Sequence, residues 1–207
     1  MAEYRTVGKA AQDEFVEKRS RFIGYVKPVQ TEEEATAFIA EMKSRHWDAT
    51  HNVYTYILRE GQLQRYSDDG EPQGTAGIPV LDVLQKSHVT DVVVVVTRYF
   101  GGILLGGGGL VRAYSHGASI ALQAGGIITI KECALLSLSC DYSQYGRVGS
   151  LIPECGGVID HTDFTENVGI SFHMPPENIE GFARQLADAT NGQVTFEQED
   201  TAYFQTE

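Results

Sequence analysis

Two short segments in the first half of the chain concentrate the residues that could bind or transform a ligand. Residues 67–77 carry three carboxylates among glycines, namely Asp68, Asp69 and Glu71. Carboxylate oxygens can ligate Mg²⁺, although a spacing this short is more typical of a capped turn. Residues 98–109 contain six glycines and precede a predicted helix. Glycines let backbone N–H groups approach an anion and a helix N-terminus favours negative charge, so this segment is the best candidate for an anion site.

The glycine-rich segment matches neither of two common phosphate-binding motifs. No Gly-Lys-Ser/Thr sequence closes it, as a Walker A loop requires. In a dinucleotide fingerprint that begins with Gly106 and Gly108, the third glycine would fall on Val111. Glycines also permit positive φ and close packing in a tight loop, so a structural explanation stays open beside an anion or partner site.

Two arginines flank the glycine-rich segment and could complete the same site. Arg98 directly follows the predicted central strand, and Arg112 lies in the helix that comes next. Ligand sites collect where such a strand ends, so we expect residues 67–77 and 98–109 to face each other there. The arginines would then either pair with the acidic residues or hold an external anion.

No pattern of reactive side chains predicts a catalytic centre. The six histidines form no HExxH or Cys/His spacing, and there is no GxSxG elbow. Ser115 and His116 are sequential, so their side chains diverge on a helix. We therefore expect no catalytic residue, no metal and no cofactor, which favours a binding protein over an enzyme. Three cysteines without a CxxC pattern predict buried thiols in a reducing compartment: Cys133, Cys140 and Cys155.

The elements that position the first site follow from apolar periodicity. Five successive valines within residues 91–97 predict a strand that is covered on both faces and lies centrally in its sheet. Thr31 and Glu34 form a capping box at the start of a helix. Further elements are predicted as two strands within 13–29, strands at 50–58 and 63–67, a short helix near 78–84, a helix over 110–124, and strands at 127–131 and 134–140.

The last third of the chain predicts a second domain. The strand ending at Cys140 is followed by a helix capped by Asp141, a hairpin over 157–165 and 168–174, a helix after Pro175-Pro176, and a final strand at 194–197. The order β-α-β-β-α-β is typical of a ferredoxin-like module. We therefore predict an α+β protein of two domains, 1–131 and 132–207.

Charge divides the chain at the same place. Its 207 residues carry a net charge of −12. Residues 1–131 hold 14 basic and 15 acidic side chains, whereas residues 132–207 hold 2 and 13. Nucleic acids attract proteins through clustered Lys and Arg, so any nucleic-acid contact is expected from the first domain alone. No apolar run reaches the ~20 residues of a membrane span, and the first residues lack the apolar core of a signal peptide, which predicts a cytoplasmic protein.

Two long motifs resemble the IMPACT family, in particular its bacterial two-domain, YigZ-type members. They are SDDGEPQGTAGIPVL at 67–81 and VVTRYFGGILLGGGGLVRAY at 95–114. The resemblance extends to SRFIGYV at 20–26 and ATHNVYTYIL at 49–58. The matching residues that we take as candidate ligand- or partner-binding residues are Asp68, Asp69, Glu71, Thr75, Arg98, Tyr99, Gly101, Gly102, Gly106, Gly108, Gly109 and Arg112.

The resemblance implies more about fold and role than the motifs do. It implies a first domain similar to a small-subunit ribosomal protein domain and to GHMP kinases, and a second domain similar to the C-terminal domain of elongation factor G. In eukaryotic members the family is tied to translational control, and it implies no catalytic residue.

Three functions follow as hypotheses. The first is a non-enzymatic regulator that binds a protein or ribonucleoprotein of the translation apparatus. The second is an RNA-binding module that uses Arg98, Arg112 and residues 18–21 as its basic surface. The third is an enzyme that holds a phosphate at the glycine-rich loop and a metal at the acidic loop.

Overall fold

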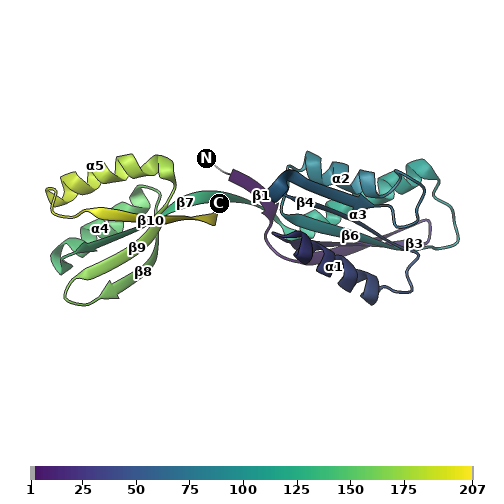
Figure 1. Cartoon of the computed structure of the whole chain (residues 1–207), viewed down its shortest axis with the longest axis horizontal. Helices are drawn as coiled ribbons and strands as arrows, with labels where there is room; N and C mark the ends of the chain where they lie inside the picture. Colours follow the sequence, from purple (N-terminus) through teal and green to yellow (C-terminus); the bar gives the residue numbers. More distant parts are fainter. Residues whose placement is uncertain (1–2, 207) are drawn as a thin grey trace. The chain divides into compact units, whose positions relative to one another are not determined.

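The computed structural model describes residues 3–206, which divide into two compact units. The first comprises residues 4–129, and the second comprises residues 130–206 together with Glu3. The chain passes between them within one strand, β7 (Ile127–Cys140), where the sequence predicted two. This division lies two residues before the predicted boundary at 131/132. Both units combine helices with an antiparallel sheet, which confirms the α+β class (Figure 1). No helix among the described residues is long and apolar enough to span a membrane.

The first unit is built on a sheet whose centre is the valine-rich strand. The strand order is β2-β3-β6-β4-β5, so β6 pairs with β3 on one side and with β4 on the other. This confirms the predicted central position. The strands are β2 (Ala11–Glu17), β3 (Ser20–Pro28), β4 (His51–Leu58), β5 (Leu63–Ser67) and β6 (Val92–Tyr99), with the short helix η1 (Glu60–Gln62) between β4 and β5.

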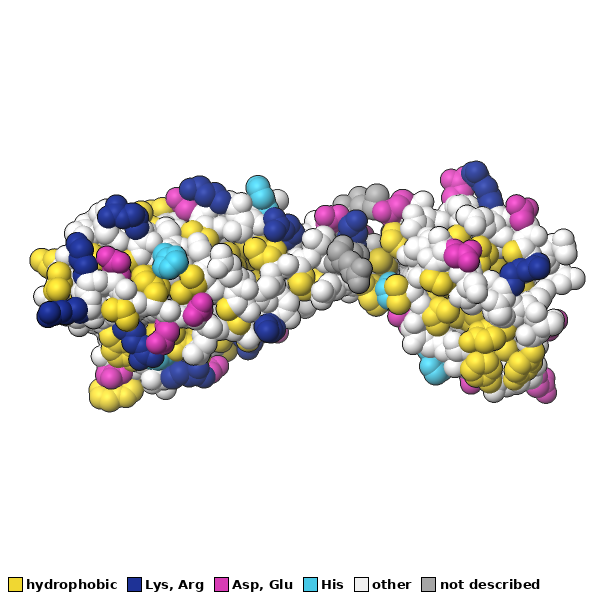
Figure 2. Space-filling model, turned by 180° about the vertical axis from the view of Figure 1, so that it is seen from behind, with side chains coloured by type: hydrophobic (Ala, Val, Ile, Leu, Met, Phe, Trp, Pro, Cys, Tyr) yellow, Lys and Arg dark blue, Asp and Glu magenta, His cyan; other side chains and the backbone are white. Residues whose placement is uncertain are grey.

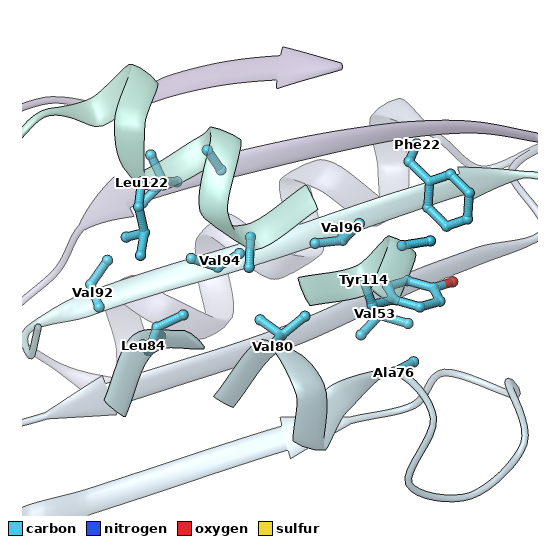
Figure 3. Packing of buried hydrophobic residues seen from close by; sticks show 14 of the residues in the cluster. Phe22, Val53, Ala76, Val80, Leu84, Val92, Val94, Val96, Tyr114 and Leu122 are labelled. Atoms are coloured by element: carbon cyan, nitrogen blue, oxygen red, sulfur yellow. The ribbon is translucent and has the colours of Figure 1, made fainter. Parts of the chain in front are cut away.

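Helices cover both faces of this sheet, which is why the five successive residues Val92–Val96 of β6 are all apolar. Val92, Val94 and Val96 face α2 (Gly77–Lys86) and α3 (Gly107–Gly125), as Figure 3 shows. The alternate valines Val93 and Val95 belong to a second cluster beneath α1 (Glu32–Arg45). Successive side chains of a strand point to opposite faces, so a strand between two layers of helices cannot alternate apolar with polar residues.

Local signals account for where α1 begins and why α3 lies close to the sheet. Thr31 Oγ1 accepts a hydrogen bond from the Glu34 N–H at 3.2 Å, which confirms the predicted cap of α1. A side chain at Gly24 of β3 would overlap the carbonyl of Gly117, so the two glycines allow α3 to pack directly on the strand. α3 begins at Gly107, three residues before the predicted Leu110, although glycines disfavour a helix.

The second unit has the predicted ferredoxin-like order. Strand β7 pairs with β9, β10 and β1, and β9 pairs with β8. Besides β7, the elements of this unit are α4 (Tyr142–Glu154), β8 (Val158–Phe164), β9 (Val168–Met174), the short helix η2 (Pro176–Asn178), α5 (Ile179–Thr190) and β10 (Phe196–Thr206). Strand β1 (Glu3–Val7), which pairs with β7, belongs to the first unit except for Glu3.

Two details of the second unit differ from the sequence prediction. Strand β10 starts at Phe196 and runs to Thr206, well past the predicted end at 197. Its polar sequence hides this length, because pairing with β7 rather than an apolar pattern extends it. Asp141 does precede α4, but its side chain makes no capping hydrogen bond.

Each unit has its own core. The clusters of the first unit and the cluster around Ile170 and Phe172 share no residue. The two units also differ in surface charge. On the face shown in Figure 2, most Lys and Arg side chains lie on the first unit.

Separate cores predict that the units respond separately to a core cavity. Ile170→Ala should lower the free energy of unfolding of the second unit by about 2–5 kcal/mol, because it removes buried methyl groups from a packed site. Amide hydrogen exchange along Val92–Val96 should stay unchanged. Val94→Ala provides the reverse control. Equal loss of protection in both units with either variant would contradict the prediction.

Candidate functional site

The acidic loop and the start of the glycine-rich segment meet through one buried ion pair. Arg98 Nη1 lies 2.6 Å from Glu71 Oε1, and the two side chains are only 6% and 3% exposed. Arg98 ends up there because it stands near the end of β6, opposite Phe22 of β3 and His51 of β4. Residues 67–77 and 98–109 therefore meet as predicted, and the contact between them is the ion pair of Glu71 with Arg98.

Neighbouring side chains complete the hydrogen bonding of Glu71. The Tyr114 hydroxyl of α3 donates to Glu71 Oε1 at 2.7 Å, and His51 Nε2 lies 3.7 Å from Oε2. Burial, together with the nearby carboxylate, raises the pKa of Tyr114, so its hydroxyl remains a donor. The Arg98 guanidinium lies 5.5 and 5.3 Å from the ring centres of Phe22 and Phe100. Its Nε is buried and has no hydrogen-bond partner among residues 3–206.

The other acidic residues of the loop are used within the fold. Asp68 accepts hydrogen bonds from the N–H groups of Gly74, Ala76 and Gly77, so it caps the start of α2. Asp69 lies 2.6 Å from Lys43 Nζ and accepts the Asn52 N–H at 2.7 Å. The Thr75 hydroxyl donates to the Pro72 carbonyl. These contacts support the capped-turn interpretation over a metal site for Asp68 and Asp69. Among residues 3–206, no group of three or more His, Cys, Asp or Glu side chains could hold a metal ion.

The two segments line a common cavity of about 410 Å³. Its polar wall contains His51, Glu71 and Arg98. The sequence-based prediction did not include the apolar wall of this cavity, because it considered only polar side chains and glycines as candidate site residues. That wall consists of Pro72, Phe100, Leu104, Leu105 and Leu110. His51 was missed too, because it joins the site through its register opposite Arg98 on the neighbouring strand, which the tertiary structure decides.

Most glycines of the segment have a structural reason. A side chain at Gly101 would overlap the backbone of Arg19, and one at Gly109 would press on Leu105 at 3.0 Å. Gly102 and Gly106 have φ values of 83° and 74°, which favour glycine. For these four residues the structural alternative accounts for the residue type.

Two predicted site residues lie apart from this ion pair. Tyr99 follows Arg98 and therefore points to the opposite face of the sheet, where its hydroxyl lies 2.8 Å from His46 Nδ1. Arg112 is exposed on α3 and makes no ion pair or hydrogen bond with another described residue. Of the two alternatives left open for the arginines, pairing with the acidic loop is therefore found for Arg98 and not for Arg112 among the described residues.

The ion pair predicts unequal effects for the two arginines. Arg98→Ala leaves Glu71 charged and buried, so it should lower the free energy of unfolding by about 3–5 kcal/mol. Arg112→Ala removes an exposed, unpaired side chain and should change it by no more than about 0.5 kcal/mol. Urea unfolding of both variants measures the difference. Equal effects would contradict the assignment.

The network around Tyr99 predicts a pH dependence. Tyr99 donates to Asp48, so it accepts from His46 Nδ1, and His46 Nε2 accepts from Tyr25 at 2.6 Å. This arrangement needs a neutral ring, and burial, with Arg45 adding to it, lowers the pKa of His46. As the pH falls below about 6.5, His46 therefore binds a proton more readily in the unfolded chain than in the folded protein. The free energy of unfolding should decrease as the pH is lowered.

His46→Gln separates this contribution from other titrations. Glutamine keeps one donor and one acceptor but does not titrate. Urea midpoints measured above and below a pH of about 6.5 should fall less for the variant than for the wild type. An equal fall in both proteins would show that His46 does not contribute.

Comparison with known proteins also divides the chain into two domains. The Impact N-terminal domain matches residues 18–122, and a domain of unknown function, DUF1949, matches residues 138–193. The IMPACT family member YvyE of Bacillus subtilis is 37% identical over 203 residues, which cover 98% of this chain and 94% of that protein. The IMPACT family member YigZ of Escherichia coli is 36% identical over 182 residues, or 86% and 88% of the two chains.

More distant relatives and solved structures extend the comparison. The mouse protein IMPACT is 36% identical over 96 residues, which are 44% of this chain and 30% of the mouse protein. A crystal structure of a hypothetical protein matches with a TM-score of 0.61 and 32% identity, covering 97% of this chain and 98% of that one. The matches to YvyE and YigZ span nearly the whole chain, and so this protein belongs to the IMPACT family.

Proposed function

We propose that this chain is a non-enzymatic binding protein of the translation apparatus that recognises a protein or ribonucleoprotein partner through residues 100–104 and the cavity beside them. The observation that carries the proposal is the exposure of large apolar side chains in this loop. Leu104 is 81% exposed, Phe100 44% and Ile103 40%. Exposed apolar side chains beside an apolar cavity are typical of a surface that binds another molecule.

Family membership supports the connection with translation. The family resemblance implies a role in translational control, and the Impact N-terminal domain, matched here over residues 18–122, contains the whole candidate site. The buried Arg98–Glu71 pair anchors the base of the loop, so the apolar side chains project from a rigid support. A pre-organised surface loses less conformational entropy when it binds.

The charge distribution favours a protein surface over RNA as the partner's contact. Of the basic surface suggested by the sequence, Arg98 is buried against Glu71, and Arg21 pairs with Glu14 at 2.6 Å. Lys18, Arg19 and Arg112 remain, which are few cations for a phosphate backbone. The proposed enzyme alternative loses support as well, because Asp68 and Asp69 are engaged within the loop. We place the activity in the cytoplasm, where the free thiols of Cys133, Cys140 and Cys155 stay reduced.

The proposal predicts that Leu104→Ser weakens partner binding without unfolding the chain. The immobilised wild-type chain should retain a translation-apparatus component from lysate after nuclease treatment, and the variant should retain about fivefold less, as expected for losing one apolar contact. Val158→Ser, an exposed aliphatic residue of the second unit, is the matched control. Equal retention by both variants would contradict the proposal, as would the failure of the wild-type chain to retain any component of the translation apparatus.

A further inference from the structure

We propose that the second unit binds an arginine-rich segment of another protein on a group of aromatic side chains at the start of α4. This group, the aromatic cluster, consists of Tyr142, Tyr145 and Phe164. It belongs to the second unit, whereas the partner surface proposed above belongs to the first, so neither proposal depends on the other.

Helix α4 and the β8–β9 hairpin hold the rings of the aromatic cluster together. Phe164 is the last residue of β8, and its ring centre lies 5.4 Å from that of Tyr145 and 6.4 Å from that of Tyr142. The Tyr142 hydroxyl donates a hydrogen bond to the Thr165 carbonyl at 2.7 Å. This bond connects the first turn of α4 to the turn of the hairpin, so the rings have a defined arrangement.

Two of the three rings are more than half exposed. Tyr142 is 56% exposed and Phe164 is 55% exposed, and only Tyr145 packs against the core of the unit. Neighbouring apolar side chains on a surface mark interaction sites, and aromatic residues are enriched at the centres of protein interfaces. The aromatic cluster is therefore a candidate contact surface for another molecule.

Carboxylates beside the aromatic cluster assign the charge of that molecule. Strand pairing places Phe164 opposite Val168, and Val168 opposite Cys140. Asp141 directly follows Cys140, and Glu166 lies in the β8–β9 turn. Both carboxylates therefore lie at the same end of the sheet as Phe164. Both are exposed, and neither forms an ion pair with another of residues 3–206.

The second unit itself contains few cations that could neutralise these carboxylates. Residues 132–207 hold 2 basic side chains against 13 acidic ones. The lysine and arginine side chains of residues 130–206 are engaged elsewhere, Lys131 with Glu3, Arg147 with the Ala189 carbonyl and Arg184 with Glu180. The field at the aromatic cluster therefore attracts a cationic partner.

Aromatic rings beside carboxylates suit arginine better than a nucleotide. A guanidinium group can stack on an aromatic ring while its N–H groups pair with a carboxylate. Nucleic-acid bases also stack on aromatic rings, but the phosphates between them would be repelled by Asp141, Glu166 and the negative charge of the unit. The occupant is therefore a basic protein segment and not a single-stranded nucleic acid.

Nuclear magnetic resonance of the ¹⁵N-labelled full chain tests the site with defined probes. A blocked peptide of alternating arginine and glycine should bind with a dissociation constant of about 1 mM or lower. It should shift the amides of Tyr142, Ser143, Phe164 and Thr165. The same peptide with glutamine in place of arginine should leave these amides unshifted, and so should oligouridine. Absence of a saturable shift with the arginine peptide, or a shift of the same amides by either control probe, would overturn the proposal.

One pair of variants tests the aromatic ring. Phe164→Leu keeps an apolar side chain but removes the ring, and it should weaken binding of the arginine peptide about two- to fivefold, as expected for the loss of one cation–π contact. Trp47→Leu removes a ring of the first unit that is 83% exposed, and it should leave the affinity unchanged. Equal affinities of Phe164→Leu and the wild-type chain would overturn the proposal.

A second pair of variants tests charge and leaves the aromatic cluster intact. Glu166→Lys and Glu177→Lys change the net charge equally, but Glu177 lies in η2, beyond the opposite end of β9. Glu166→Lys should weaken peptide binding at least about threefold more than Glu177→Lys. Equal weakening would show that the peptide responds only to overall charge, and would overturn the proposal. Partner retention is tested separately by Leu104→Ser, so either proposal can fail alone.

Discussion

The ion pair between Arg98 and Glu71 is the contact on which the architecture of the candidate site depends. Moving two charges out of water costs several kcal/mol for each ion, so further hydrogen bonds to the buried carboxylate help to offset this cost. Glu71 accepts hydrogen bonds from Arg98 of β6 and Tyr114 of α3, with His51 of β4 nearby. One carboxylate thus connects the acidic loop to two strands and a helix. Removal of any partner leaves charge or hydrogen-bonding capacity uncompensated in the interior.

This rigid base explains how an apolar loop can be exposed without collapsing onto the sheet. Gly101 fits only because it lacks a side chain against Arg19, and Phe100 is held by a hydrogen bond from its N–H to Thr50. The loop therefore leaves the sheet at a defined point and presents Ile103 and Leu104 outward. A surface of this kind supports recognition of another molecule by a domain whose acidic side chains are largely occupied within the fold.

Most glycines of the same segment are required by the fold. Gly101, Gly102, Gly106 and Gly109 are needed either for close packing or for positive φ. Gly107 and Gly108 have no such requirement, because a side chain at either position would make only ordinary contacts with the described residues.

Local patterns in the sequence were sufficient to predict the elements and much of their order. Five consecutive valines predicted the central strand, Thr31 predicted the start of α1, and the spacing of apolar residues predicted the β-α-β-β-α-β order of the second unit. These features depend on residues within a few positions of one another, so periodicity and capping rules are sufficient to predict them. The IMPACT resemblance likewise rested on two contiguous motifs, and the family comparisons confirmed it.

Only the tertiary structure decided which polar groups are partners. Glu71 rather than Asp68 or Asp69 received Arg98, Arg112 remained unpaired, and Tyr99 faced His46 instead of the cavity. Strand pairing likewise made β7 continuous and extended β10 through a polar sequence. The physical reason is that ion pairing and burial act between residues far apart in the chain. Composition shows that a carboxylate and an arginine are both present, but the energy of their contact depends on distance, desolvation and competing hydrogen bonds.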